Sequence, residues 1–163
     1  MRSMIDYAMI LSKVNRQIRE ATDEIIIREQ QSIKEQPAYP FATYSIMNPY
    51  LNVKTYREDN IKMTQSVEIT VSYTFYSQDS LSLMGIVQNA LTNFEHRATR
   101  QVLWDNGIAV IDVTGIQNRD TFLTIDVERR LGFDIRLRVN NISEKELRDI
   151  ITIELEDGSE IHK

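Results

Sequence analysis

Four side chains in the second half of the sequence have the types and spacing of a divalent-metal site. Asp112 lies on one predicted strand, and Asp126 and Glu128 lie on the next. Carboxylates from adjacent strands are ligands that Mg²⁺ uses in metal-dependent nucleases. Arg130 then stands where such a nuclease has a lysine, but arginine is no charge-tunable donor. A polar sheet face with cross-strand ion pairs accounts for the same residues, and the nuclease stays an alternative.

Other catalytic or metal-binding patterns are missing from the sequence. The chain has no cysteine and two histidines, His96 on a predicted helix and His162 in the carboxyl-terminal tail. These residues give no pattern of a zinc site or of a Ser/His/Asp triad. His96 is predicted to be a surface residue of a helix. The five glycines form no phosphate-binding loop. Apart from the nuclease alternative, the sequence offers no candidate catalytic, metal-binding or cofactor-binding residue.

Length and charge restrict the class of protein. The chain of 163 residues is predicted to form a single domain, and its net charge of −5 comes from acids and bases that are interspersed. This balance argues against a dedicated DNA-binding protein, which usually has a basic face. No apolar run approaches the ~20 residues of a membrane span, and the first residues lack signal-peptide features. We expect a cytosolic, reducing environment.

Hydrophobic periodicity predicts helices that pack on a sheet. A seven-residue repeat of Met4, Leu11, Ile18 and Ile25 predicts a helix over 3–28, with Ser3 as its N-cap. The order of elements predicts an α+β fold, in which a mostly antiparallel β-sheet is flanked by two α-helices. Further predicted elements are strands over 41–47, 66–76 and 108–113, an extended loop or irregular hairpin over 49–65 and a helix over 80–101, capped by Ser77 or Asp79.

One long alternating stretch dominates the second half of the chain. Apolar and polar residues alternate over 121–139, about three times the usual strand length. Gly132 is the expected place for a kink in this strand. Arg129 interrupts the apolar row, so we expect it to form a structural ion pair or to meet a neighbouring subunit. Residues 147–163 are predicted to form a last strand and a polar tail.

Several short motifs resemble those of a known family. The resemblance extends over about residues 36–139, and the motifs are specific in combination and not singly. They are Tyr39-Pro40-Phe41-Ala42-Thr43-Tyr44 with Pro49-Tyr50, then Asp105-x-Gly107-Ile108, Ile116-Gln117-Asn118-Arg119-Asp120 and Glu128-Arg129-Arg130-x-Gly132-Phe133-Asp134-Ile135-Arg136. Together they resemble the neck, or tail-terminator, proteins of long-tailed bacteriophages and prophages.

The resemblance implies a structural virion protein of the phage neck that is assembled in the host cytoplasm, is not an enzyme and has no cofactor, metal or catalytic residue. Such proteins form a ring, commonly of six subunits, on the last ring of the tail tube, where they end polymerisation and meet the head connector. The implied partners are copies of the chain itself, the tube protein, the sheath protein in contractile tails and the connector or stopper, with DNA passing through the lumen without specific binding. Another neck protein, a stopper or adaptor, is the alternative within this class. Candidate contacts between subunits or with partners are Tyr50, Tyr56, Arg57, Arg119, Asp120, Arg129 and Arg130.

Overall fold

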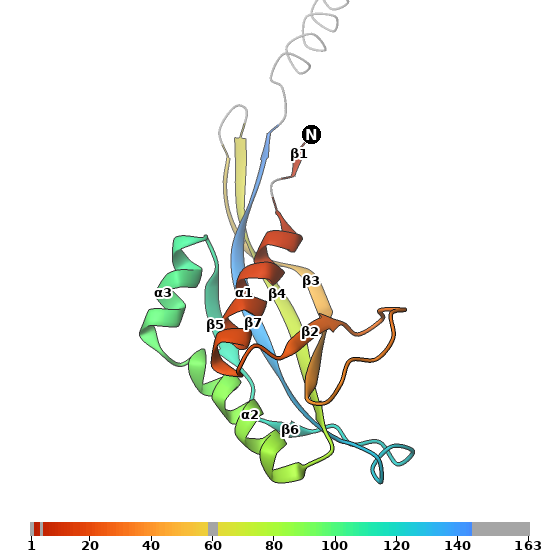
Figure 1. Cartoon of the computed structure of the whole chain (residues 1–163). Helices are drawn as coiled ribbons and strands as arrows, with labels where there is room; N and C mark the ends of the chain where they lie inside the picture. The colour runs from red at the N-terminus through yellow and green to blue at the C-terminus, as the bar shows by residue number, and fades with distance from the viewer. Residues whose placement is uncertain (1, 4, 59–61, 145–163) are drawn as a thin grey trace, which may run out of the picture.

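The computed structural model describes residues 2–3, 5–58 and 62–144, and it has the predicted α+β architecture (Figure 1). Three helices lie on one face of a mixed, mostly antiparallel sheet. The helices are α1 Tyr7–Ala21, α2 Ser80–Asn93 and α3 Arg97–Asp105. The strands are β1 Arg2–Ser3, β2 Ile26–Glu29, β3 Phe41–Glu58, β4 Lys62–Ser77, β5 Ala109–Val113, β6 Gln117–Asn118 and β7 Arg129–Glu144.

The centre of the sheet is β4, which lies between β7 and β3 in the order β1-β7-β4-β3-β2. Its pairing with β7 is antiparallel and unbroken from Lys62↔Glu144 to Ser77↔Arg129. Alternate residues of both strands turn towards the helices, as the period-two pattern predicts. The buried residues on this face include Val67, Ile69, Val71, Tyr73 and Phe75 of β4 and Phe133, Ile135 and Leu137 of β7.

The first helix is shorter than the predicted 3–28. Asp6, and not Ser3, is its N-cap, because the Asp6 side chain accepts the N–H of Met9 at 3.0 Å. The helix ends at Ala21, and Asp23 and Glu24 then adopt positive φ angles of 54° and 59° that reverse the chain. The apolar residues at 25–27 therefore belong to the turn and to β2, which pairs in parallel with the start of β3.

The predicted helix over 80–101 is two helices. Asp79 caps α2, as the sequence indicates, through its carboxylate and the N–H of Ser82. The helix ends after Asn93, and the exposed His96 adopts extended backbone to begin α3. Arg100 of α3 donates to the Phe94 carbonyl at 2.7 Å, which satisfies a backbone acceptor that the break leaves without a helical donor.

Residues 49–65 form a hairpin and not an extended loop. β3 continues to Glu58, β4 begins at Lys62, and the two strands pair with register shifts around Asn48 and Leu51. Asn48-Pro49, a dipeptide typical of turns, is instead an irregular position within β3. Pro49 is tolerated there because β2 pairs with β3 only as far as Tyr44, so no neighbouring strand needs an N–H beyond it.

The long alternating stretch is a strand only in its second half. β7 begins at Arg129 and continues past the predicted end, to Glu144. Residues 122–127 form tight turns instead, in which the carbonyls of Thr121 and Thr124 each accept two backbone N–H groups. β7 has no kink at Gly132, because its register with β4 is unbroken across this residue. The predicted strand and tail over 147–163 lie outside the described residues.

One end of the sheet extends beyond the helices. Residues 52–58 of β3, 62–67 of β4 and 139–144 of β7 form a three-stranded arm that rises above α1 (Figure 1). In the arm the polar residues Gln65, Asn141 and Ser143 continue the parity of the core residues. None of the helices in the described part of the chain is long and apolar enough to cross a membrane.

Candidate functional site

Four of the predicted contact residues, Arg119, Asp120, Arg129 and Arg130, lie together at the end of the sheet opposite the arm. They join β6, the turn over 121–127 and the start of β7. Arg129 pairs with Ser77 in the register, so the start of α2 and this turn lie at the same end of the sheet. The remaining three candidates lie on β3, far along the sheet from this cluster.

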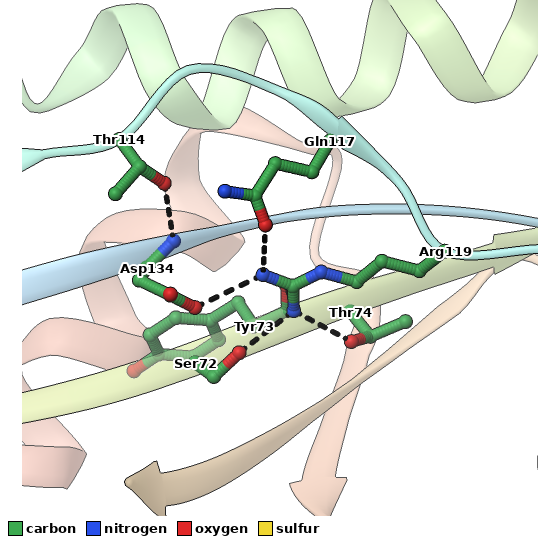
Figure 2. A network of polar contacts seen from close by, with 7 residues as sticks. All are labelled: Ser72, Tyr73, Thr74, Thr114, Gln117, Arg119 and Asp134. Atoms are coloured by element: carbon green, nitrogen blue, oxygen red, sulfur yellow. Dashed lines mark hydrogen bonds and ion pairs between the residues drawn. The ribbon is translucent and has the colours of Figure 1, made fainter. Parts of the chain in front are cut away.

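Arg119 is the most connected side chain of this cluster (Figure 2). It lies across the open face of the sheet, where no helix packs, and is 20% exposed. Its Nη2 donates to Asp134 Oδ1 at 2.9 Å and to Gln117 at 3.1 Å. Its Nη1 donates to the hydroxyls of Ser72 and Thr74 and to the Tyr73 carbonyl, at 2.7, 3.0 and 3.0 Å. This guanidinium therefore ties the β6 segment to β4 and β7.

Gly132 is required by this arrangement. A Cβ at this position would lie 2.2 Å from the Tyr73 carbonyl oxygen and 2.8 Å from the Arg119 guanidinium. Both distances are far shorter than any real Cβ contact, so only glycine fits beneath the arginine. The glycine that the sequence suggested as a bend thus serves close packing, which is the other common role of glycine inside a strand.

Asp120 closes the base of the turn over 121–127. Its Oδ2 accepts Arg129 Nε at 3.0 Å, and its Oδ1 accepts the backbone N–H of Arg130 at 2.6 Å. The Asp120 side chain is 8% exposed, whereas Arg129 is 40% exposed. Arg129 thus forms the structural ion pair expected from its place in an apolar row, within its own subunit.

An aromatic cluster on the open face adjoins this base. The rings of Phe41 and Tyr76 stack with centroids 4.6 Å apart, and the Arg130 guanidinium lies 5.1 Å from the Tyr76 centroid. Glu128 is buried, pairs with Arg130 at 2.6 Å and accepts the Tyr39 hydroxyl at 2.7 Å. That hydrogen bond, together with burial, raises the pKa of the Tyr39 phenol. The Tyr39–Glu128 hydrogen bond joins residues 89 positions apart, and both of these residues belong to the motifs noted in the sequence.

The predicted contacts on β3 have different surroundings. Tyr50 lies at the foot of the arm, where its hydroxyl donates to Gln65 at 2.8 Å and accepts from Asn141 at 3.1 Å. Tyr56 and Arg57 pair through their backbones with Gln65 and Thr64 of β4. Tyr50 is therefore tied to the arm, and the two later residues lie near its tip.

The carboxylates of the nuclease reading are not brought together. Asp112 on β5 pairs with Arg136, while Glu128 precedes the start of β7 at Arg129. The strand positions from 129 to 136 span about 23 Å at roughly 3.3 Å per residue, which is too far for one metal ion. Asp126 is exposed on the turn. Among the described residues no three His, Cys, Asp or Glu side chains form a group that could hold a metal.

Sequence reasoning missed the exposed apolar side chains of the turn. Phe122 and Leu123 are 95% and 91% exposed, and Ile125 and Val127 are also largely uncovered. The alternation predicted a buried strand face for Leu123, Ile125 and Val127, and the structure places them in solvent. The turn is nevertheless held firmly, by Asp120 at its base and by its own backbone hydrogen bonds. Apolar side chains presented in this way indicate a surface for a partner.

Comparison with known proteins gives one match. A search of curated proteins found none that matches the chain. The model of one protein family, described as phage neck terminator protein, matches residues 12–163, which is nearly the whole chain and includes every motif on which the resemblance depends. On the strength of that match the chain belongs to the phage neck terminator protein family, and it is a structural component of the bacteriophage virion.

Proposed function

We propose that the protein forms a ring, of six subunits as is common for such proteins, at the head-proximal end of the phage tail. The ring ends polymerisation of the tail tube and joins the tail to the head connector. Membership of the neck terminator family supports this proposal. The structural observation that supports it most directly is a long edge of β3 with which none of the described strands pairs.

The outer edge of β3 is open over most of its length. Among the described residues no strand pairs with this edge from Ser45 to Glu58, because β2 ends opposite Tyr44. An unpaired edge of this length invites pairing with another chain and is a liability in a protein that stays monomeric. Adjacent subunits of a ring can cover such an edge by strand addition, and a closed ring leaves no subunit with a free edge.

The opposite edge of the sheet is less accessible to another chain than the edge of β3. β5 has only five residues, and α3 packs beside it. Arg100 of α3 donates to the Val110 carbonyl of β5 at 3.3 Å, and Trp104 lies beside the same strand. Short strands that are covered by a helix or by a charged side chain resist pairing with other chains. Shielding on one side only points to β3 as the edge used in assembly.

The arm is our proposed contact with the tail tube, the sheath or the connector. It projects past the helical layer, so its tip can reach a neighbouring ring (Figure 1). Tyr50, Tyr56 and Arg57 on β3 are the proposed contact residues. The net charge of −5 suits a passage for DNA, because like charge disfavours binding of phosphate. DNA then passes through the lumen without specific binding.

The four clustered residues have a different proposed role. Arg119, Asp120, Arg129 and Arg130 each form hydrogen bonds or ion pairs within their own subunit. In our proposal they contribute to assembly by holding the turn over 121–127 in a fixed position. Their substitution is then expected to weaken assembly through the position of that turn.

Removal of the gene from the phage tests the proposed function. Particles assembled without the protein should show tails of uncontrolled length that are not joined to heads, and supply of the protein in trans should restore both. Tails of normal length, joined to heads, would contradict the proposal. Light scattering and negative-stain images of the purified protein, alone and with tail tubes, give the number of subunits in the ring.

A further inference from the structure

Strand pairing along β3 gives no role to two surfaces of the protein, a hollow beside α1 and the exposed apolar turn. The hollow has a volume of about 620 Å³ and lies between α1 and the strands β2 and β3. Its position is distinctive because Tyr44, Ser45 and Ile46, which line it, are also the residues at which β2 leaves the edge of β3. The hollow and the open strand edge are therefore one continuous surface, which we call the α1–β3 hollow.

The α1–β3 hollow contains a cation that forms no hydrogen bond or ion pair with the described residues. Arg19 lines it and is partly buried, yet no hydrogen bond or ion pair joins its side chain to any of the residues that the structure describes. Glu29 also lines the hollow, but its carboxylate forms no ion pair with the Arg19 guanidinium. Partly buried charges are normally paired. The rest of the lining is mixed, with apolar atoms from Leu11, Tyr44 and Ile46 beside polar side chains of Ser12, Asn15, Gln30, Gln31 and Ser45. It can therefore take a segment that has both apolar side chains and an acid.

The turn over 121–127 has these properties. Phe122 and Leu123 form an apolar tip, and the exposed Asp126 lies between Ile125 and Val127. The turn is convex, whereas the hollow is concave. Its backbone hydrogen bonds and the Asp120 contacts hold it before any partner arrives, so little conformational freedom is lost when it docks.

We propose that the turn over 121–127 of one copy inserts into the α1–β3 hollow of the next copy in the ring. Phe122 and Leu123 pack against Leu11 and Ile46, and the Asp126 carboxylate pairs with the Arg19 guanidinium. This inference rests on the proposed ring function and names its interface.

The arrangement follows from the difference between the two surfaces. A contact between unlike surfaces of the same molecule is heterologous, so each copy uses its turn on one side and its hollow on the other. Such contacts close into a ring when the rotation from one copy to the next is a whole fraction of a turn. In a closed ring the Arg19 charge and the tip of the turn are covered in every subunit.

Engineered cysteines test this interface, because the natural chain has none. One variant carries Leu123→Cys in the turn, and the other carries Leu11→Cys in the hollow. When the two are mixed, assembled on tail tubes and oxidised, disulfide-linked dimers should form at least tenfold faster than with the control pair, Leu123→Cys and Gln88→Cys. Gln88 is exposed on α2, away from the hollow. A chain with both Leu123→Cys and Leu11→Cys should give a ladder that ends at the mass of the ring.

Charge reversal provides a second readout that does not depend on cysteine. Arg19→Glu and Asp126→Arg should each reduce the assembled fraction about tenfold, and the two together should restore it. Rings in which neither reversal changes assembly would overturn the inference. Cross-linking that is no faster than in the control pair would also overturn it. The same holds if the hollow cysteine, Leu11→Cys, cross-links to Ile153→Cys in the carboxyl-terminal segment and not to the turn.

The outcomes separate this inference from the proposed function. If rings form and tails keep their normal length, but the turn does not cross-link to the hollow, only the interface is wrong. If tails have normal length without the protein, the ring function itself is wrong, and the interface falls with it.

Discussion

Asp120 and Arg129 close the base of the exposed turn, with Arg129 Nε 3.0 Å from Asp120 Oδ2 although nine positions separate the residues. The second carboxylate oxygen accepts the N–H of Arg130, the first interior residue of the long strand β7. One buried side chain thus fixes both the turn and the point at which the sheet begins. The two contacts should contribute unequally to the free energy of unfolding, because the Asp120 side chain is buried and the Arg129 side chain is 40% exposed.

Substitution of Asp120 should therefore be more harmful than substitution of Arg129. Asp120→Ala removes both contacts and leaves a buried N–H without an acceptor, so we expect the free energy of unfolding to fall by about 1–3 kcal/mol. Arg129→Ala keeps the bond to Arg130, and solvent screening limits its effect to about 1 kcal/mol or less. Urea unfolding measures both values. Equal losses would mean that the ion pair, and not the backbone contact, holds the turn.

Two glycines should respond in opposite directions to alanine. Gly132→Ala places a methyl group against the Tyr73 carbonyl and the Arg119 guanidinium, so we expect a loss of at least about 2 kcal/mol. Gly85 lies inside α2, where an added Cβ meets nothing within 4 Å. Gly85→Ala should raise the free energy of unfolding by about 0.5–1 kcal/mol. Thermal unfolding of the two variants measures both changes, and a neutral Gly132→Ala would show that the Tyr73 carbonyl and the Arg119 side chain both move aside at little cost.

Arg119→Lys should be a costly change in spite of the conserved charge. The guanidinium reaches five acceptors on three segments, and a lysine ammonium cannot reproduce this planar fork. Because the site is mostly buried, we expect a loss of about 2–3 kcal/mol from acceptors left without donors. The matched control is Arg16→Lys on the exposed face of α1, where Arg16 pairs with Glu20 and a change of about 0.5 kcal/mol or less is expected. Similar losses in both variants would contradict the role of Arg119.

Alkaline pH should destabilise the fold through Tyr73. Burial raises the pKa of this phenol far above its ordinary value of 10.0, and its hydroxyl donates to Asn15 at 2.6 Å in the core. The folded protein keeps this proton, whereas the unfolded chain releases it near pH 10, so the stabilisation is complete below pH 10 and falls as the pH rises above it. Urea unfolding at pH 9 to 11.5 should show this decline. Tyr73→Phe should be less stable at pH 9 but should have a flatter slope; an unchanged slope would assign the decline to other tyrosines.

Residue alternation predicted the strands whose two faces differ in burial. It located β4 and most of β7, because each has the helices on one face and a polar or open face on the other. It failed over 121–127, where local turns satisfy the backbone and leave Leu123 and Ile125 in solvent. Alternation records the spacing of apolar residues and not what covers them, so an apolar turn meant for a partner has the same pattern as a strand.

Helix boundaries depended on local geometry that periodicity does not record. The heptad row continues through Ile25, but the positive φ angles at Asp23 and Glu24 end α1 before it. Arg119, Asp120, Arg129 and Arg130 stand in the motifs that carry the family resemblance, but the sequence did not show that they meet at the base of the turn. The hollow gave no such signal: Arg19 is one of many charged residues on an amphipathic helix, and its isolation is visible only when α1 and β3 are brought together.

The unbroken pairing of β4 with β7 also determines the order in which the sheet can be completed. β3 and β4 are neighbours in the sequence and can pair as soon as both have left the ribosome, but Lys62 meets its partner Glu144 only after 82 more residues have been made. Throughout that interval one side of the central strand has no neighbour, and contacts of such long range form slowly. A nascent chain with an open central strand is prone to aggregation, so the stretch of synthesis between β4 and β7 is the period in which this protein most needs protection by a chaperone.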